Sequence, residues 1–262
     1  MPDDSIRFDD GASYENMMGR WSLLVGEQFL NWLGAPKGAS WVDVGCGNGA
    51  FTELVVQSVA PVQVNAFDPA SAQLTYARTR LASDAPVKWA LGDAMQLPLA
   101  NASVDVAVMA LVLFFVPDPT VGVAEMFRVV RSGGLVGAYH WDVMNGGFPL
   151  ADIGAEMPSF GYQPRLPPSA SASTLEASTQ LWTKAGLRNV RTTQITVQRE
   201  FGSFDDFWNS ATTSNTLRPM LNAISVEDLA ELQARVRRRL PQADDGSVTV
   251  SARANAICGV KP

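Results

Sequence analysis

The feature that most constrains the fold is the segment 41–49, where four strand-forming residues run directly into a turn with glycine at every second position. The turn reads Gly45-Cys46-Gly47-Asn48-Gly49, and a helix-compatible stretch, 50–59, follows at once. Strand, glycine-rich turn and helix in this order open a nucleotide-binding βαβ unit. Glycine tolerates the positive φ of a tight turn, and a side chain there would clash with a ligand lying against the backbone. The first N–H groups of the helix would then face that ligand.

The rest of the chain alternates between strand and helix patterns. Further strands are predicted at 62–67, 87–91, 104–110, 135–140, 190–198 and 247–260, and helices at 14–33, 71–81, 119–130, 175–185, 201–211 and 226–240. The segment 104–110 is almost entirely apolar, which is typical of a central parallel strand buried on both faces. This alternation predicts an α/β fold with a mostly parallel sheet and right-handed crossovers.

We expect four regions along the chain. They are an N-terminal lid helix (1–40), a cofactor-binding core (41–142), a substrate cap (143–240) that contains a sixth strand at about 190–198, and a final strand (241–262) that completes the core. The stretch 143–170 is rich in Gly, Pro, Ser and Met, and we interpret it as a mobile, irregular segment crossing the mouth of the site. A disordered insertion is the alternative. The arginines at 235 and 237–239 are predicted to form the solvated side of the last helix.

Composition limits the partners. The chain has 262 residues and a net charge of −6, so a nucleic-acid partner is not expected. Its two cysteines, Cys46 and Cys258, can form neither a disulfide framework nor a metal site, which suits a reducing cytoplasm. The acidic N-terminus has no apolar signal core, and the longest apolar run, 106–116, is too short to span a bilayer. We therefore expect a cytoplasmic protein without metal or membrane partners.

Two aspartates follow predicted strands. Asp68, next to Pro69, lies at the spacing from the glycine turn where dinucleotide-type folds place the acidic residue that binds ribose hydroxyls. A turn aspartate is the alternative, since Asp-Pro is a common turn pair. Asp93 follows Gly92 at a strand end, where its side chain can reach a bound base; here too a simple turn residue is the alternative.

The predicted first helix carries Tyr14 and Arg20 ahead of the first strand. One interpretation is a lid over the ligand, with Arg20 meeting a carboxylate. The other is a helix that packs on the edge of the domain.

Taken together, these residues resemble the class I S-adenosylmethionine-dependent methyltransferases, in particular the small-molecule branch that includes the quinone-biosynthesis C-methyltransferases. The markers are the segment 42–49, Asp68, Gly92-Asp93-Ala94, the extension 111–117 after the fourth strand, and the segment 128–134. The resemblance implies a Rossmann-like sheet of seven strands with an antiparallel last strand, helices on both faces and a helical cap. It also implies S-adenosylmethionine as cofactor and a small-molecule methyl acceptor.

The resemblance assigns roles to individual positions. It places the glycine turn under the methionine part of the cofactor, Asp43 near its amino group, Asp68 at the ribose, and Asp93 at the adenine amine. Leu111 resembles the backbone contact to the methionyl amine, and Tyr14 and Arg20 resemble lid contacts. The cofactor-binding set is Tyr14, Arg20, Asp43, Gly45, Cys46, Gly47, Gly49, Asp68, Pro69, Asp93, Ala94, Met95 and Leu111.

The acceptor chemistry is less constrained. Enzymes that methylate amino groups of bases or glutamine place Asn or Asp with Pro-Pro-aromatic after the fourth strand, whereas this chain has Ala110-Leu111-Val112-Leu113. Many relatives carry a histidine near position 114, where this chain has phenylalanine. His140, the single histidine, ends the fifth strand, at the edge where such sheets bind ligands, and is our candidate base for a hydroxyl or an acidic carbon. A histidine satisfied by a neighbour at the strand end is the alternative.

Two other functions stay open. Gly45, Gly47 and Ala50 satisfy a looser dinucleotide fingerprint, which is compatible with an NAD(P)-dependent oxidoreductase. A non-catalytic module that binds S-adenosylmethionine would share every cofactor contact and lack turnover.

Overall fold

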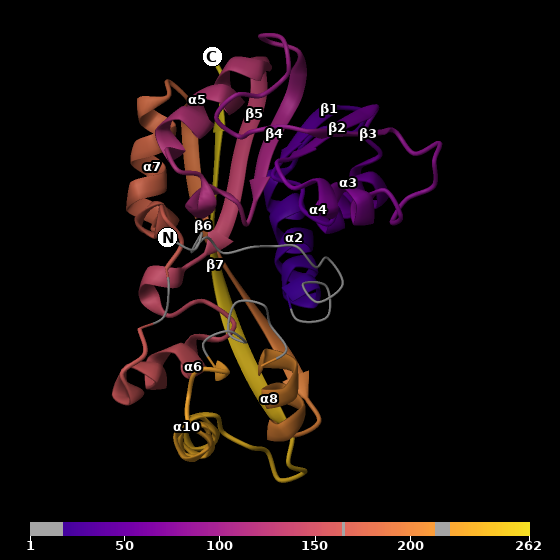
Figure 1. Ribbon diagram of the computed structural model, residues 1–262. Coiled ribbons are helices and arrows are strands. Elements are labelled where there is room, and N and C mark those ends of the chain that lie inside the picture. Colours follow the sequence, from indigo (N-terminus) through magenta and orange to yellow (C-terminus); the bar gives the residue numbers. More distant parts are fainter. Residues whose placement is uncertain (1–17, 164–165, 213–220) are drawn as a thin grey trace.

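Seven strands form a single sheet in the order β3-β2-β1-β4-β5-β7-β6 (Figure 1). The computed structural model describes residues 18–163, 166–212 and 221–262. The strands are β1 (Ser40–Val44), β2 (Gln63–Asp68), β3 (Val87–Leu91), β4 (Val104–Ala110), β5 (Val130–Trp141), β6 (Arg188–Phe201) and β7 (Val248–Val260). Neighbours among β1 to β5 are parallel, and β7 runs antiparallel to both β5 and β6. The predicted fold class is confirmed, including the antiparallel last strand.

Helices cover both faces of the sheet because side chains of the central strands are apolar on both sides. The helices are α2 (Arg20–Leu33), α3 (Ala50–Val59), α4 (Ser71–Ala77), α5 (Pro119–Val129), α6 (Ala151–Glu156), α7 (Leu175–Lys184), α8 (Phe204–Thr212) and α10 (Val226–Arg239). Short 3-10 turns are η2 (Leu113–Phe115), η3 (Val143–Asn145), η4 (Met157–Phe160) and η5 (Ala170–Ser173). On β4, Val106 and Val108 join the core under α2 and α3, whereas Ala107 and Met109 join the core under α5 and α7. Strand β4 is therefore the buried centre of the fold, as its apolar run predicts.

The fifth strand begins earlier than predicted. Residues 131–134 do not form a turn that separates helix from strand; they belong to β5 as an irregularity in its pairing with β4. Gly133 N donates to the carbonyl of Lys261, and Lys261 N donates to that of Gly134. The end of β7 thus provides the hydrogen bonds that keep this glycine pair in the sheet, a long-range partner that local sequence does not reveal.

Strands β6 and β7 continue past the edge of the sheet as a two-stranded ribbon. Trp141, the last residue of β5, is opposite Ala254, and the pairing of β6 with β7 continues to Phe201 and Val248. Helices α6, α8 and α10 gather around this ribbon (Figure 1). Of the segment 143–240, α7 contacts the sheet and the first half of β6 forms the edge strand of the sheet. The stretch 143–170, predicted as irregular, includes α6 and two 3-10 turns.

The arginines of α10 do not form a merely solvated side, as the sequence pattern predicts. Arg239 pairs with Asp152 and Glu156 of α6, both at 3.1 Å, and Arg237 pairs with Asp205 of α8 at 2.6 Å. Arg235 contacts Ser159 at 3.1 Å and lies 4.9 Å from the ring centre of Phe160. Three of these four guanidinium groups thus join α10 to other parts of the cap.

Replacing Arg239 with alanine should lower the free energy of unfolding by about 1 kcal/mol, because two ion pairs between α10 and α6 are lost and the pairs are partly exposed. Urea unfolding at low and high salt measures this, and the loss should shrink at high salt. Arg238→Ala is the matched control, since the ion pair of Arg238 among the described residues is with Glu231 of its own helix. Equal losses for the two variants would contradict the assignment.

Candidate functional site

The glycine turn is held by the end of the neighbouring strand. The N–H groups of Gly45 and Cys46 both donate to the carbonyl of Phe67, at 2.8 and 2.9 Å. The three glycines have φ of 75°, 52° and 84°, values that side-chain-bearing residues rarely adopt. The turn therefore sits at the carboxyl ends of β1 and β2, where open α/β sheets bind their ligands.

The glycines differ in what they face. A Cβ on Gly45 would lie 2.6 Å from Cγ2 of Val112, and one on Gly49 would lie 2.9 Å from the Trp89 ring. A Cβ on Gly47 would meet nothing within 4 Å. At Gly45 and Gly49, protein side chains already occupy the space that a Cβ would need, whatever the position of a ligand. Gly47 alone of the three has an open side.

Asp43 is buried beneath this turn with half of its carboxylate unsatisfied. Its Oδ2 accepts a hydrogen bond from the Thr52 hydroxyl of α3 at 2.5 Å, while Oδ1 has no partner in the described part of the chain. Burial raises the pKa of Asp43 to about 7; the Thr52 hydrogen bond opposes this rise, and the charge of Asp68 adds to it. A buried acceptor in this state requires a donor, which a ligand or an ordered water can supply.

Asp68 holds the turn as well as facing it. Its Oδ2 accepts from the N–H of Gly47 at 2.9 Å and its Oδ1 from the N–H of Ala70 at 2.8 Å. Each carboxylate oxygen has a further lone pair, so these bonds leave acceptor capacity for hydroxyl groups. Burial raises the pKa of Asp68, and the two backbone hydrogen bonds oppose the rise. Pro69 follows at the strand end, and the buried Cys46 thiol lies in the turn itself.

Asp93 is exposed after β3, next to Ala94 and Met95 in a turn. Its Oδ1 accepts from the N–H of Met95 at 2.8 Å. A Cβ on Gly92 would press against the Phe67 side chain at 3.0 Å, so this turn packs close to the end of β2. This bond shows that Asp93 stabilises its turn, and its contact with a bound base stays a prediction.

Leu111 follows β4 with φ of 63°, an uncommon conformation for a residue with a side chain. Its N–H donates to the carbonyl of Tyr139 at 2.8 Å, and its side chain is buried. Such conformations gather at functional sites, where the surrounding structure compensates for the strain. The strained residue lies at the same sheet edge as the glycine turn.

His140 lies near the end of β5 with no exposed surface. The Phe114 ring meets it edge-on at 6.5 Å between ring centres. Neither ring nitrogen has a hydrogen bond of normal geometry in the described part of the chain. Burial lowers the pKa of His140 to about 4, while the Asp142 charge and the Ser173 backbone act in the opposite direction. The ring is therefore neutral at physiological pH.

The N-terminal candidates are only partly described. Tyr14 lies outside the described residues. Arg20 begins α2 and is exposed. Burial lowers the pKa of Arg199 on β6, and the charge of Arg20 lowers it further, which places two guanidinium groups near each other. Arg199 also lies 5.4 Å from the ring centre of Trp21 and 4.8 Å from that of Phe201.

Several residues that support the site were not predicted from the sequence. They are Thr52, which binds Asp43; Val112, which fills the space at Gly45; and Asn255, which lies opposite His140 on β7. Thr52 lies in the first turn of α3, directly after the glycines, and this position in the sequence is a signal that could have identified it as a site residue. The pairing of Asn255 with His140 depends on strand register, which local sequence does not specify.

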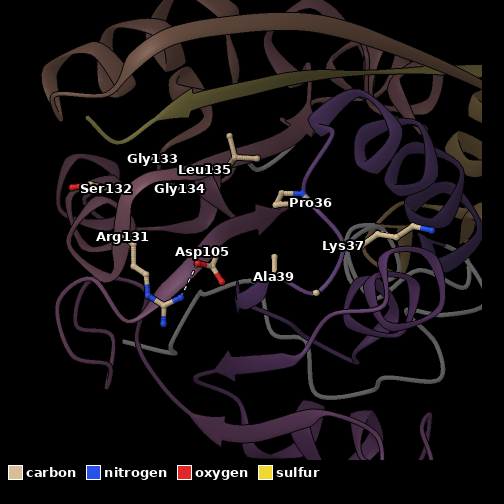
Figure 2. A pocket seen from close by; sticks show the side chains of 10 residues that line it. Pro36, Lys37, Ala39, Asp105, Arg131, Ser132, Gly133, Gly134 and Leu135 are labelled. Atoms are coloured by element: carbon tan, nitrogen blue, oxygen red, sulfur yellow. Dashed lines mark hydrogen bonds and ion pairs between the residues drawn. The ribbon is translucent and has the colours of Figure 1, made fainter.

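A separate hollow of about 370 Å³ lies at the opposite, amino-terminal edge of the sheet (Figure 2). Its wall includes Lys37, Asp105, Arg131 and Ser132, and an Arg131–Asp105 ion pair of 2.7 Å crosses it. Asp105 also accepts from the N–H and hydroxyl of Ser40, so this ion pair joins the starts of β1, β4 and β5. The hollow is far along the strands from the glycine turn and contains none of the predicted site residues.

Among the residues that the structure describes, no cluster of three or more His, Cys, Asp or Glu side chains is suited to hold a metal ion. None of the described helices combines the length and apolar character needed to cross a membrane.

Comparison with known proteins is consistent with this geometry. Residues 42–137 match the family model described as a methyltransferase domain. A demethylmenaquinone methyltransferase of Staphylococcus aureus is 36% identical over 105 residues, which is 40% of this chain and 44% of that protein. The match thus spans less than half the length of the curated relatives.

Solved structures extend the likeness of fold to almost the whole chain. A Bacillus halodurans protein assigned as a methyltransferase has a TM-score of 0.61 at 16% identity, with 90% of this chain and 98% of that chain covered. Phosphoethanolamine N-methyltransferase 2 of Haemonchus contortus, solved with S-adenosyl-L-methionine, has a TM-score of 0.60 at 17% identity over all of this chain and 61% of that chain.

The two kinds of glycine should respond differently to alanine. Gly45→Ala should lower the free energy of unfolding by about 2–3 kcal/mol, because the new Cβ collides with the stiff Val112 side chain at positive φ. Gly47→Ala, with the same kind of φ and open space, should lose about 1 kcal/mol. Denaturant unfolding measures both, and a larger loss for Gly47→Ala would contradict the packing described.

The buried histidine predicts a pH dependence of stability. The folded ring binds fewer protons than the unfolded chain between pH 6.5 and 4, so stability should fall as pH falls through this window. The full contribution is about 3 kcal/mol. Asp43 has the opposite effect: because its pKa is raised, its contribution to stability increases as pH falls from 7 to 4. The contribution of the histidine is therefore measured as the difference between wild type and His140→Gln. Wild type and His140→Gln with equal pH slopes in chemical unfolding would show that the ring is not held neutral.

Proposed function

We propose that the protein is an S-adenosylmethionine-dependent methyltransferase acting on oxygen or carbon of a small organic acceptor, because residues 42–137 match the family model described as a methyltransferase domain. The Haemonchus structure with bound S-adenosyl-L-methionine, which shares the fold, supports the choice of cofactor. The Staphylococcus relative supports a small-molecule acceptor. We also propose a cytoplasmic location, which the two buried cysteines without a disulfide support.

The observation that carries this proposal is the buried Oδ1 of Asp43, two residues before the glycine turn, which has no hydrogen-bond partner among the described residues. S-adenosylmethionine has a primary ammonium group, which is a donor that a buried carboxylate oxygen accepts directly or through a water. The positive charge of that ammonium would also favour the ionised form of Asp43, whose pKa burial has raised. The site therefore fits the proposed group in both hydrogen bonding and charge.

The remaining contacts are proposed from the resemblance to the methyltransferase family. Asp68 would accept hydrogen bonds from the ribose hydroxyls, and Asp93 would accept one from the adenine amine, with Ala94 and Met95 beside the ring. The carbonyl of Leu111 would face the methionyl amine. Arg20 and Tyr14 would approach the carboxylate from the lid.

Bound S-adenosylmethionine supplies a methyl group on a positively charged sulfur, and transfer of the methyl leaves a neutral thioether. The protein's part is to bind, orient and exclude water. The acceptor oxygen or carbon gains the methyl and gives up its proton, and a ring nitrogen of His140 would take that proton. A neutral imidazole with a lowered pKa suits an acceptor whose own proton is already acidic, such as a phenol, an enol or an activated carbon.

The cap would shape the acceptor site. Apolar side chains from α8, α10 and the β6–β7 ribbon form one core with α2 beyond the sheet edge, including Phe204, Trp208, Leu232 and Val250. This surrounding favours an acceptor with apolar surface. We propose 1–40 as the lid, 41–142 as the cofactor-binding core, 143–240 as the segment that carries the cap together with the sixth strand, and 241–262 as the closing strand.

A module that binds the cofactor without turnover is the second candidate. It is favoured by the complete burial of His140 and by the Val112 side chain that fills the space at Gly45. A nicotinamide-dependent oxidoreductase is the third candidate, and the glycine spacing alone supports it.

Titration calorimetry with S-adenosylmethionine and with NADH, in separate experiments, tests the cofactor. We expect binding of the first and not of the second. Asp68→Ala should weaken the binding by about 1–3 kcal/mol, because the ribose hydroxyls lose their acceptor. Asp105→Ala, which removes a carboxylate at the opposite edge of the sheet, is the matched control and should leave the dissociation constant unchanged. An unchanged constant for Asp68→Ala would refute the ribose assignment.

Turnover needs a separate test. A panel of phenols, enols and amines is incubated with the protein and S-adenosylmethionine, and release of the demethylated cofactor is measured. Cofactor binding with no release from any acceptor would favour the non-catalytic module.

A further inference from the structure

The point where the chain leaves the sheet after β5 is held by a compact set of hydrogen bonds. Oδ2 of Asp142 accepts from Nε and Nη2 of Arg253 at 3.1 and 2.8 Å, and its Oδ1 accepts from Nδ2 of Asn145 at 2.9 Å. The N–H of Asp142 donates to the carbonyl of Arg253, and the N–H of Gly147 donates to that of Asp142. We call Asp142, Asn145, Gly147 and Arg253 the hinge cluster. It lies where β7 passes from the sheet into the ribbon of the cap.

Within the hinge cluster, Gly147 has no room for a side chain. A Cβ on Gly147 would lie 2.6 Å from the carbonyl oxygen of Arg253 and 2.8 Å from Cβ of Asp142. The N–H of Arg253 also donates to the carbonyl of Gly147 at 2.9 Å. The backbone of the turn 142–147 is therefore in direct contact with the backbone of β7. The Asp142–Arg253 ion pair joins the same two segments through their side chains.

A second attachment brings the same segment back over His140. Ser169 donates from its N–H to the carbonyl of Phe114 and from its hydroxyl to that of Val116. The carbonyl of Ser173, at the end of η5, accepts from Nδ2 of Asn255 at 2.8 Å. Asn255 is the β7 residue directly opposite His140. Between its two attachments the chain forms α6 and η4 of the cap, so the cap is joined to the sheet on both sides of the histidine.

The charges around the ring come from few groups. On its own strand the ring has Asp142 two residues further on; β7 contributes the neutral Asn255 and the cation Arg253; η5 contributes only Ala and Ser; and η2 contributes Phe114. Of the titratable groups in the described part of the chain, Asp142 is the one whose charge acts on the ring. Asp142 is almost completely buried, and Arg253 is its only cationic partner there.

We propose that Arg253 is a positioning residue for His140: through Asp142 it fixes the point where the cap leaves the sheet, and its cation offsets part of the Asp142 charge that acts on the imidazole, so that the buried ring stays neutral. This inference rests on the proposed methyltransferase function for its purpose, and the geometry stands without it. An unpaired carboxylate at Asp142 would attract a proton onto the buried ring. The ion pair keeps that proton away while it holds the turn.

The chain has one histidine, which allows a direct test. A single imidazole signal in NMR spectra of the full-length protein can be followed against pH without knowledge of any acceptor. Wild type should titrate well below pH 6.5. Arg253→Gln should raise the midpoint by about 1 in pH, because the Asp142 charge is no longer compensated. Arg253→Lys, which keeps a cation, should stay near wild type, and Asp142→Asn should titrate at a lower pH than wild type.

Arg131→Gln is the matched control. It breaks an Arg–Asp ion pair of similar length at the opposite edge of the sheet and should leave the midpoint unchanged. A midpoint in Arg253→Gln equal to that of wild type would overturn the proposal. If Arg253→Gln fails to fold, the other two variants decide: Arg253→Lys near wild type with Asp142→Asn below it supports the proposal, and a raised midpoint in Asp142→Asn overturns it.

Calorimetry with S-adenosylmethionine on the same samples separates this inference from the proposed function. If wild type does not bind S-adenosylmethionine, the proposed function is refuted, whereas the conclusions from the histidine titration still hold. Normal binding with an unmoved midpoint in folded Arg253→Gln would refute only the positioning role. Once an acceptor is found, the acid limb of kcat/KM against pH should move in the same order as the NMR midpoints.

Discussion

The structure depends on the attachment of the glycine turn to the end of the second strand. Two consecutive N–H groups, those of Gly45 and Cys46, share the carbonyl of Phe67, and the Asp68 carboxylate takes the N–H of Gly47. These bonds bend the chain sharply from β1 into α3 and place the Asp43 carboxylate beneath the turn. The glycine turn thus shapes the carboxyl-terminal edge of the sheet. Next to it lies a buried carboxylate oxygen, Oδ1 of Asp43, which has no hydrogen-bond donor among the described residues. The proposed cofactor site follows from a backbone arrangement more than from any one side chain.

The long antiparallel pair β6–β7 connects the sheet to the cap. Its first half completes the sheet, and its second half carries the cap beyond the edge where the glycine turn lies. The ribbon continues beyond the end of β5 because β6 and β7 pair with each other along almost their whole length. The cap, the hinge cluster and the covering of His140 all depend on this continuation. Ion pairs from α10 then fix the cap helices to one another.

The sequence predicted the sheet well because its signals are local. Alternating or apolar runs bounded by Gly, Pro and Asp identify β1 to β4, and Asp118-Pro119 marks the start of α5, where the Asp118 side chain accepts from two helical N–H groups. Predictions failed where a distant partner decides. The pair Gly133-Gly134 joins β5 through Lys261, and the α10 arginines bind α6 and α8. The role of Asp43, Asp68 and Asp93 as binding residues stays a prediction, although all three lie at the expected strand ends.

The sequence by itself determined the order of strands and helices along the chain, the position of the glycine turn and the acidic residues near the carboxyl ends of β1, β2 and β3, since each of these depends on residues close together in the chain. Only the tertiary structure decided which glycine is open, that Asp43 keeps an unsatisfied oxygen, and that His140 is sealed and neutral. Those properties depend on Val112, Thr52, Asn255 and Arg253, which reach the site from other elements through packing and strand register. Burial and register are set by the whole fold, so no local pattern contains them.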